Sequence, residues 1–420
     1  MKNRIVLTFL IALSVISAIG VTTLGCGKAV ITATTTTTFP SIPTGLTAAG
    51  SLGFIQLNWN ASNGPGLFGY NVYKSSDGVN YFKANNSLVT ELHYNDSIPS
   101  PSGDGIYYYY KVAAVGSEES GFSSTVKSMH GTRLPAINSS GFTTQVANSP
   151  YVAEGNVVVN GGDLKIMDHT KLYVTDNCTI DIEQGDGWYK GCFLVSNGLL
   201  RVMASAQAPA TFTSHRVGEP LGTNEGFSLR FYYSGVNYNP ADDSGTLVQN
   251  TYIKNLKSGN SLQISNGASA KLYNLKISSD MSETGGNYLS IGGNSSAIIR
   301  NCSFIKMAPS INTDLRLTTF KMDHNIFRGG YWAIVFDGLT NPGISLGQIE
   351  YNDFDCTGKP GHAYLSNMTG GANVPIGYNY WNGGLGTPPK PTELQGGTTN
   401  IHYDFNPLLI SPPANAGPTW

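Results

Sequence analysis

The sequence has few charged residues and no surplus of either sign. Only 12% of its 420 residues are charged, with 25 Lys and Arg against 27 Asp and Glu, and the formal net charge is −2. Proteins that bind nucleic acid through its phosphates usually carry a basic surplus or a basic stripe. Neither is present here, so we expect no nucleic-acid partner.

Cysteines are also scarce, and none are paired at a metal-binding spacing. The chain has five, none in a CxxC motif, and the closest two, Cys178 and Cys192, are fourteen residues apart. A zinc site built from thiolates needs closer spacing, so no such site is predicted. Cys26 lies just after the N-terminal apolar run and is considered separately below. The other four cysteines are an even number, which is compatible with an oxidising compartment.

Glycine and tyrosine are abundant by contrast. The chain has 50 glycines and 23 tyrosines, and 40% of its residues are hydrophobic. High glycine content with low charge favours turn-rich β structure over packed helices. The length and the apolar content predict two or three domains with hydrophobic cores.

The N-terminus has the features of an export signal. Lys2 and Arg4 precede an apolar run from 5 to 21, which is shorter than the ~20 residues of a membrane-spanning helix. Gly25-Cys26 after this run resembles the bacterial lipoprotein signal, although Thr23 stands where that pattern favours Leu. The resemblance implies an exported cell-envelope protein, at the cell surface or outer membrane, whose only membrane contact is a lipid on Cys26. A secreted protein is the alternative if Cys26 is not lipidated.

The next segments predict a tether and a first domain. Residues 1–25 form the predicted lipoprotein-type signal peptide, and residues 26–41, with five consecutive threonines, form an extended tether. From 42 to 134, short alternating runs are separated by Gly, Pro, Asn and Ser, which predicts a β-sandwich. Four motifs in this segment resemble a fibronectin type III domain: Pro43-x-x-Leu46, Leu57-x-Trp59, Gly69-Tyr70-x-Val72-Tyr73 and Tyr108-x-Tyr110-x-Val112. The resemblance implies that Trp59 is the core tryptophan and that the Tyr108 hydroxyl bonds a nearby backbone group.

A six-residue pattern, apolar-x-x-Z-x-apolar, recurs in the segment from 140 to 390. Its copies begin 19, 27, 23, 27 and 27 residues apart, which suits the coils of a solenoid with variable loops. Two inward positions three residues apart break strict alternation, so we expect a bend between two short strands in each copy. In chain order the residues at Z are Leu256, Leu275, Cys302, Asn325, Asn352 and Asn379.

The last three of these residues predict an internal asparagine ladder. Successive coils stack about 4.8 Å apart, so the amides of Asn325, Asn352 and Asn379 can hydrogen-bond to one another and to the backbone. Their predicted role is structural, because they satisfy buried polar groups at the bend.

The repeat resembles the right-handed parallel β-helix of the pectate-lyase-like superfamily. The resemblance implies an all-β chain: a fibronectin type III β-sandwich, a right-handed parallel β-helix of about nine coils over residues 140–390, and a C-terminal tail over 391–420. Members of this superfamily include lyases, hydrolases, esterases, adhesins and inert spacers, so the fold does not determine the activity.

Two sets of acidic residues could serve an enzyme. Asp323, Glu350, Asp353 and Asp355 are expected to point outward on adjacent coils, where carboxylates could bind calcium as in lyases of this shape. Asp314, Asp337 and His362 follow an order that resembles polygalacturonase-type glycosidases. However, Asp314 precedes its predicted strand and Asp337 follows its own, so their carboxyl groups should not converge. We therefore assign no catalytic residue and no metal ligand, and calcium is the one cofactor left open.

Aromatic residues favour a binding surface instead. His324, Tyr351 and Tyr378 stand just before Z on three consecutive copies, so their rings are predicted to form an outward strip about 10 Å long. Such a strip could stack on sugar rings, and Trp332 could extend it. We predict a noncatalytic protein that binds polysaccharide or a cell-surface ligand, including in adhesion. The alternatives are a polysaccharide lyase or glycosidase on the β-helix and a structural spacer of the envelope.

Overall fold

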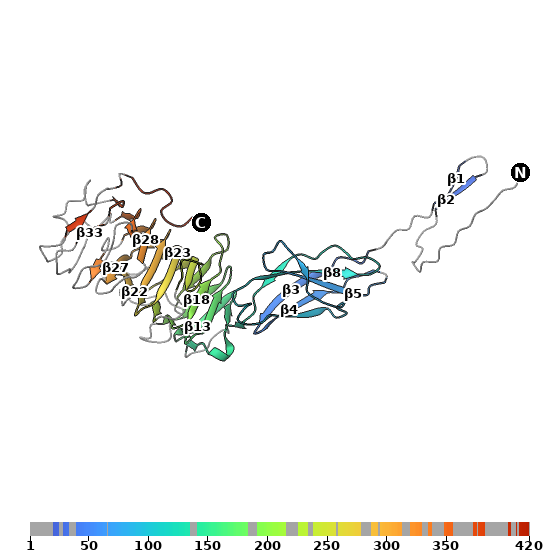
Figure 1. Cartoon of the computed structure of the whole chain (residues 1–420), viewed down its shortest axis with the longest axis horizontal. Coiled ribbons are helices and arrows are strands. Elements are labelled where there is room, and N and C mark those ends of the chain that lie inside the picture. Colours follow the sequence, from blue (N-terminus) through green and yellow to red (C-terminus); the bar gives the residue numbers. More distant parts are fainter. Residues whose placement is uncertain are drawn as a thin grey trace. The chain divides into compact units, whose positions relative to one another are not determined.

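The computed structural model of the chain confirms the all-β fold class (Figure 1). The residues described are 20–24, 28–32, 39–64, 66–134, 141–183, 191–215, 226–233, 238–257, 259–278, 287–292, 295–312, 320–329, 335–337, 348–355, 373–375, 377–382, 402–404, 409 and 411–419. Within these ranges the one helical element is the 3-10 turn η1 (Val146–Asn148), and no helix has the length and apolar character to cross a membrane.

The chain divides into two compact units. The first comprises Met1–Ala49, Gln56–Asp96 and Tyr107–Ser128. The second comprises Gly50–Ile55, Ser97–Ile106 and Met129–Trp420. Near the N-terminus, β1 (Gly20–Leu24) and β2 (Lys28–Thr32) pair as an antiparallel hairpin.

The first unit contains the fibronectin type III β-sandwich. One sheet has the order β3 (Thr44–Ser51), β4 (Phe54–Asn60), β7 (His93–Ser97). The other is antiparallel, with the order β6 (Phe82–Lys83), β5 (Gly69–Ser75), β8 (Tyr108–Val115), β9 (Val126–Ser128). Alternate residues face the core, as the period of a strand requires. Trp59, which is 4% exposed, packs edge-on against the buried Tyr70 ring, with the ring centroids 5.3 Å apart.

The implied role of Tyr108 is wrong, because Tyr110 is the buried tyrosine of this strand. Both face the inside of the sandwich, but Tyr108 lies at the strand end, where it is half-exposed beneath the Lys74 ammonium. Tyr110 is fully buried and its hydroxyl donates to Asp96 Oδ2 at 2.6 Å. Burial and the carboxylate partner together raise the pKa of Tyr110 far above its ordinary value.

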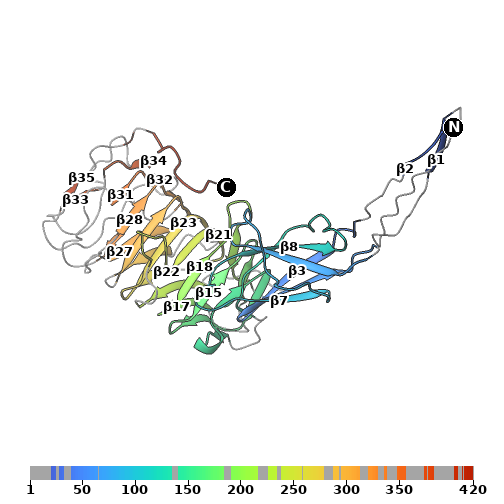
Figure 2. The same cartoon turned by 45° about the vertical axis from the view of Figure 1, so that its right-hand side comes forward.

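The second unit is a right-handed parallel β-helix whose strands stack from coil to coil (Figure 2). Its largest sheet follows the path β10 (Thr132–Arg133), β12 (Tyr151–Ala153), β15 (Lys171–Val174), β18 (Leu199–Val202), β21 (Leu247–Ile253), β23 (Ser269–Ser278), β26 (Ser303–Ile305), β29 (Ile326–Arg328), β32 (Asp353–Asp355), β34 (Tyr380–Asn382). Beside this path lie β13 (Asn156–Asn160), β16 (Thr179–Glu183), β19 (Ala210–Thr213), β25 (Ser296–Arg300), β28 (Phe320–Asp323) and β31 (Ile349–Glu350).

A second sheet of eight parallel strands forms another face of the same coils. Its order is β11 (Phe142–Thr143), β14 (Leu164–Met167), β17 (Cys192–Ser196), β20 (Ser228–Tyr232), β22 (Gly259–Ser265), β24 (Asn287–Ile291), β27 (Ala308–Asn312), β30 (Val335–Asp337). Near the C-terminus, β33 (Asn373–Pro375) pairs with β35 (His402–Asp404). Eight and ten strands along the two paths agree with the predicted count of about nine coils.

One hydrophobic core runs through the coils, from Leu134 to Phe354. Side chains of one kind stack on themselves along it: the Phe304, Phe327 and Phe354 rings lie nearly parallel, with centroids 4.7 and 5.1 Å apart. Such stacking follows from the parallel register, which places equivalent residues of neighbouring coils in line about 4.8 Å apart.

The predicted first member of the Z series is wrong. The strand register aligns Leu275 with Thr251, not with Leu256. Leu256 instead lies at a later corner of the same coil, where it bridges to Phe227. The two corners look alike in sequence because each has an asparagine in the left-handed conformation, Asn250 at φ 46° and Asn255 at φ 58°.

Candidate functional site

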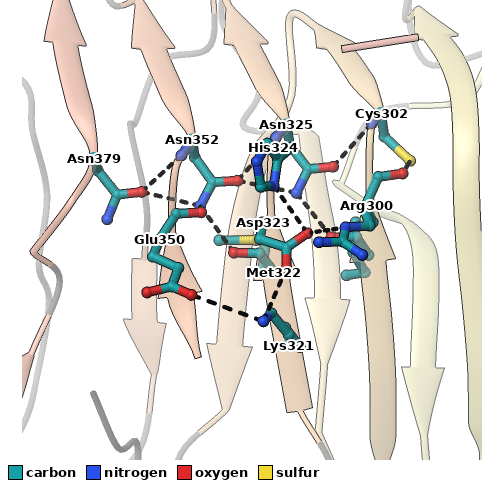
Figure 3. A network of polar contacts seen from close by, with 11 residues as sticks. Arg300, Cys302, Lys321, Met322, Asp323, His324, Asn325, Glu350, Asn352 and Asn379 are labelled. Carbon is teal, nitrogen blue, oxygen red and sulfur yellow. Dashed lines mark hydrogen bonds and ion pairs between the residues drawn. The ribbon is translucent and has the colours of Figure 1, made fainter. Parts of the chain in front are cut away.

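Three buried asparagines form a continuous hydrogen-bonded row inside the β-helix (Figure 3). Asn325 Nδ2 donates to Asn352 Oδ1 at 3.0 Å, and Asn352 Nδ2 donates to Asn379 Oδ1 at the same distance. The same oxygens accept backbone N–H groups of the preceding coil, from Asn325 at 3.1 Å and Asn352 at 2.9 Å. Each amide therefore satisfies polar groups that the bend would otherwise leave buried and unpaired.

Cys302 occupies the position that precedes this row. Its backbone N–H donates to Asn325 Oδ1 at 2.9 Å, and its thiol donates to the Leu272 carbonyl at 3.5 Å. Asn325 Nδ2 makes the equivalent contact one coil later, to the Ile299 carbonyl at 2.9 Å. The thiol is free and buried, and burial raises its pKa to about 12, so it acts as a small apolar residue and a weak donor.

The residue just before each inward-facing Z position of the repeat adopts the left-handed conformation. We call these residues the bend column, and their φ values lie between 46° and 57°: Asn250, Asn274, Asn301, His324, Tyr351 and Tyr378. Asparagine and histidine are enriched in this conformation, but tyrosine adopts it at a cost of about 1–2 kcal/mol. Residues held in such conformations concentrate at functional sites, which directs attention to the last three members.

Those last three members, His324, Tyr351 and Tyr378, form what we call the ring column. The His324 and Tyr351 rings lie 5.3 Å apart at an interplanar angle of 25°, and the Tyr351 and Tyr378 rings lie 5.6 Å apart at 34°. The rings thus cover one another's inner faces, so a ligand beside the column would meet ring edges and hydroxyl groups more than open faces. All three residues are half-buried, and among the described residues neither tyrosine hydroxyl has a hydrogen-bond partner.

The C-terminal segment, residues 411–419, lies along the bend column. The Gly417 N–H donates to the His324 carbonyl at 2.7 Å, and the Thr419 N–H donates to Asn274 Oδ1 at 2.8 Å. Gly417 is buried at φ 85°, and a Cβ there would lie 2.5 Å from Ile326 Cδ1. Only glycine fits this approach without displacing its neighbour, so the segment has a specific position beside the ring column.

Asp323 is at the centre of a charged cluster next to the ring column (Figure 3). Its Oδ1 is 2.7 Å from Arg300 Nε and its Oδ2 is 3.2 Å from Lys321 Nζ, which is also 3.7 Å from Glu350 Oε1. His324 Nδ1 lies 3.4 Å from the same Oδ1. The Arg300 and Lys321 side chains are 46% and 44% exposed, so the buried carboxylate fixes two cationic groups at the surface.

Asp323 and Asp353 are only 1% and 2% exposed, so neither carboxylate has the open position on the outside of the coils from which calcium binding was expected. Arg300 and Glu350 pair with Asp323 in register from the two neighbouring coils, so long side chains cover its carboxylate. Asp353 is held by the guanidinium of Arg328. Both carboxylates are therefore bound by cationic side chains of the same protein. In the described part of the chain, no cluster of three or more His, Cys, Asp or Glu residues is suited to a metal ion.

Several sequence-predicted residues lie outside the described residues. These are the lipidation candidate Cys26, the added ring Trp332, and Asp314 and His362 of the glycosidase alternative. Asp337 is the last residue of β30, where its backbone aligns with Asn312 of β27.

Sequence reasoning missed three features. The first is the packing of residues 411–419 on the bend column. This segment contains Pro and Ala in no repeating pattern, and Gly417 was its one signal of a close backbone contact. Arg300 could have been found by aligning the repeat copies, which puts it level with Asp323. Asp104 is distant in sequence from its partners His130 and Lys171, so no local pattern could show that they meet.

Comparison with known proteins finds resemblance to solved structures only. No model of a protein family matches the chain, and no curated protein matches it. A fibronectin-III-like protein from Clostridium thermocellum is 33% identical over 21% of this chain and 90% of its own, with a TM-score of 0.18. A pectate lyase from Erwinia chrysanthemi is 10% identical over 88% of this chain and 99% of its own, with a TM-score of 0.18. An exopolygalacturonase from Yersinia enterocolitica is 9% identical over 89% and 100%, with a TM-score of 0.17.

These TM-scores are low, and the class of fold follows from the strand pairing. The chain is an all-β protein with a fibronectin type III sandwich in one unit and a parallel β-helix in the other. Its β-helix neighbours among solved structures include pectate lyases and a polygalacturonase.

Proposed function

We propose that this protein is a noncatalytic binding component of the cell envelope that holds a polysaccharide or another surface glycan on the ring column of its β-helix. The observation that supports the proposal is the column itself. Three aromatic residues occupy left-handed positions where asparagine costs less, and they are half-buried in a continuous stack. Stacking between the rings, together with contact to a ligand, would offset the cost of placing aromatic residues in the left-handed conformation.

The chemistry of the column suits sugar hydroxyls. The Tyr351 and Tyr378 hydroxyls can each donate and accept a hydrogen bond, and the stacked rings restrict the side chains before a ligand arrives. Arg300 and Lys321 lie beside the column and could contact an acidic substituent. The paired and buried state of Asp323 and Asp353 favours binding over acid–base chemistry, because a general base needs a carboxylate free to accept a proton.

The location of the protein is part of the same proposal. The N-terminal signal would direct export, a lipid on Cys26 would be the only membrane contact, and the threonine-rich segment 26–41 would extend the two units away from the membrane. The charge balance gives no support for nucleic acid as a partner.

A glycan-binding screen with product analysis tests the proposal. The purified protein is screened on a glycan array with and without calcium, and every bound polysaccharide is then incubated with the protein and analysed for cleavage. We expect binding without products, and we expect the double variant Tyr351→Ala, Tyr378→Ala to bind about 5- to 150-fold more weakly, since each ring contact is worth about 0.5–1.5 kcal/mol.

Tyr233→Ala is the matched control, because Tyr233 also has a left-handed conformation, at φ 58°, but is exposed and outside the column. This variant should bind as the unchanged protein does. Unsaturated products would identify a lyase and new reducing ends a glycosidase, and either would overturn the proposal. A screen with no bound glycan would favour the spacer alternative.

A further inference from the structure

A second group of rings lies in the first unit, on the outer face of the sheet β6–β5–β8–β9, where Phe122 is exposed and the tyrosines are partly exposed. Strand alternation places this group there, because Val72 and Tyr110 face the core while their neighbours Tyr73 and Tyr109 face outward. The six residues that define this sheet face are Tyr73, Tyr81, Phe122, Lys83, Lys111 and Lys127.

The strand register orders rings and lysines into rows. Tyr73 of β5 is aligned with Lys83 of β6 on one side and with Lys111 of β8 on the other. Two strand spacings of about 4.8 Å therefore separate the two lysine backbones by roughly 10 Å, with a tyrosine between them. In the next row, Tyr109 of β8 is aligned with Lys127 of β9.

Ring contacts orient the lysines of this face. The Lys111 ammonium lies 4.2 Å from the Tyr81 ring centroid and 5.7 Å from that of Phe122, and the Lys127 ammonium lies 4.4 Å from that of Tyr107. Such contacts are worth about 0.5–1 kcal/mol at exposed sites, enough to restrict a flexible side chain. Phe122 packs edge-on against Tyr73 at 4.9 Å yet is 50% exposed, which is a large apolar ring left in solvent.

One carboxylate on this face, that of Glu119, has neutral hydrogen-bond donors. Glu119 accepts hydrogen bonds from the Tyr73 hydroxyl at 2.9 and 3.0 Å and from Asn71 Nδ2 at 3.0 Å. Desolvation and this carboxylate raise the pKa of Tyr73, so its ring stays neutral. Lys83, Lys111 and Lys127 outnumber this carboxylate on the sheet face, although the whole chain is close to neutral.

We infer that this sheet face is a second binding surface, and that its ligand is an acidic polysaccharide chain. Flat rings alternate with ammonium groups along the rows, and a uronate chain presents a matching alternation of apolar sugar C–H faces and carboxylates. The ring content favours a glycan over an acidic peptide, because a pure charge contact would not need the exposed Phe122 ring and the partly exposed tyrosines among the lysines. The surface lies in the first unit and does not depend on the function proposed for the β-helix.

The test measures binding of the purified protein to polygalacturonate, with dextran as the neutral glycan and polyglutamate as the acidic peptide. The variant Lys83→Gln, Lys111→Gln, Lys127→Gln should lose at least tenfold in affinity for polygalacturonate, while the same positions changed to Arg should keep it. The control variant Lys254→Gln, Lys276→Gln, Lys306→Gln removes the same charge from the β-helix and should bind normally.

The unchanged protein should also bind polygalacturonate more weakly as NaCl rises from 50 to 500 mM, because exposed charges are screened. If the triple Gln variant fails to fold, the single variants Lys83→Gln, Lys111→Gln and Lys127→Gln are measured in its place, and each should bind polygalacturonate more weakly than the unchanged protein. Equal binding by the Gln variant, insensitivity to salt, or equal affinity for polyglutamate would each overturn the inference. Loss of binding in the Lys variant but not in the Tyr351 and Tyr378 variant separates this surface from the ring column.

Discussion

At the scale of single residues, a buried carboxylate must be matched by cationic or donor groups. Asp104 shows this in the second unit, where its side chain is 5% exposed. Lys171 Nζ lies 2.7 Å from Oδ2, and Nε2 of the fully buried His130 lies 3.0 Å from Oδ1. Burial by itself would raise the pKa of Asp104, but the close contact of His130, the hydrogen bond from Lys171 and the charge of Lys171 outweigh it, so the pKa is lowered.

Asp104→Asn should therefore destabilise the second unit. A group whose pKa is lower in the folded state contributes stability above its unfolded pKa of about 3.9 and loses that contribution as the pH falls further. We expect the free energy of unfolding to fall by about 1–3 kcal/mol at pH 7, with the difference between the two proteins shrinking below about pH 4. Urea denaturation at a series of pH values measures both effects.

Glu154→Gln is the control for that experiment. Glu154 pairs with Arg133 at 2.9 Å, but both side chains are partly exposed, and such pairs contribute at most about 1 kcal/mol. If Asp104→Asn costs no more than Glu154→Gln, or if its cost does not change below pH 4, then Asp104 is not the stabilising carboxylate that its contacts indicate.

At the scale of elements, the position of asparagine at the bend changes along the β-helix. On earlier coils asparagine lies in the bend column, where Asn274 Nδ2 donates to Asn250 Oδ1. On later coils it lies at the inner position, and rings replace it in the bend column. The coils from Asn250 to Asn274 and those from Cys302 to Asn379 thus share a polar or stacked contact at one side of the bend, which helps to keep the register of their short strands.

The middle of the inner row should be its most sensitive point. Asn352→Ala would remove the acceptor of the buried Asn325 N–H and one donor to the buried Met322 carbonyl. We expect the free energy of unfolding to fall by about 2–4 kcal/mol, measured by urea denaturation. Asn301→Ala, in the bend column, should cost only about 1 kcal/mol, since it mainly loses a residue suited to the left-handed conformation. Equal costs would contradict the ladder.

Extending the row is the complementary test. Cys302→Asn should be tolerated, because an amide there could donate to the Leu272 carbonyl and to Asn325 Oδ1 in the way that Asn325 bonds its own neighbours. Cys302→Val should be less stable than Cys302→Asn, since valine offers no donor to that carbonyl. Thermal unfolding of the two variants side by side checks the order, and the reverse order would show that packing outweighs the hydrogen bonds.

At the scale of the whole molecule, the end of the chain returns to earlier coils. Residues 411–419 contact the bend column at His324 and Asn274, which are 93 and 145 residues before their partners Gly417 and Thr419. The contact is made through one buried glycine at positive φ, so the position of the segment depends on that residue.

Gly417→Val should release the segment while leaving the β-helix folded. A valine at φ 85° is strained by about 1–2 kcal/mol and its side chain would meet Ile326. We expect faster hydrogen exchange and faster proteolysis of residues 411–419, with little change in the unfolding transition of the coils. Ala414→Val, at an exposed position of the same segment, is the control and should leave exchange unchanged. Equal protection in both variants would show that Gly417 does not hold the segment.

The sequence by itself determined the class of each domain and the alignment of most coils. Period-two alternation, turn residues and the spaced repeat are local signals, and the parallel stacking of equal copies places Asn325, Asn352 and Asn379 in line without further information. The same reasoning failed at Leu256, because two corners of one coil share the same local pattern and only the strand register distinguishes them.

Only the tertiary structure decided how the side chains of the candidate site are covered and paired. The burial of Asp323 depends on Arg300 and Glu350 from neighbouring coils, and the place of Gly417 depends on a contact across 93 residues. A local pattern predicts the direction of a side chain from its strand. It does not predict which distant residue lies over that side chain, because burial and charge pairing are properties of the assembled surface.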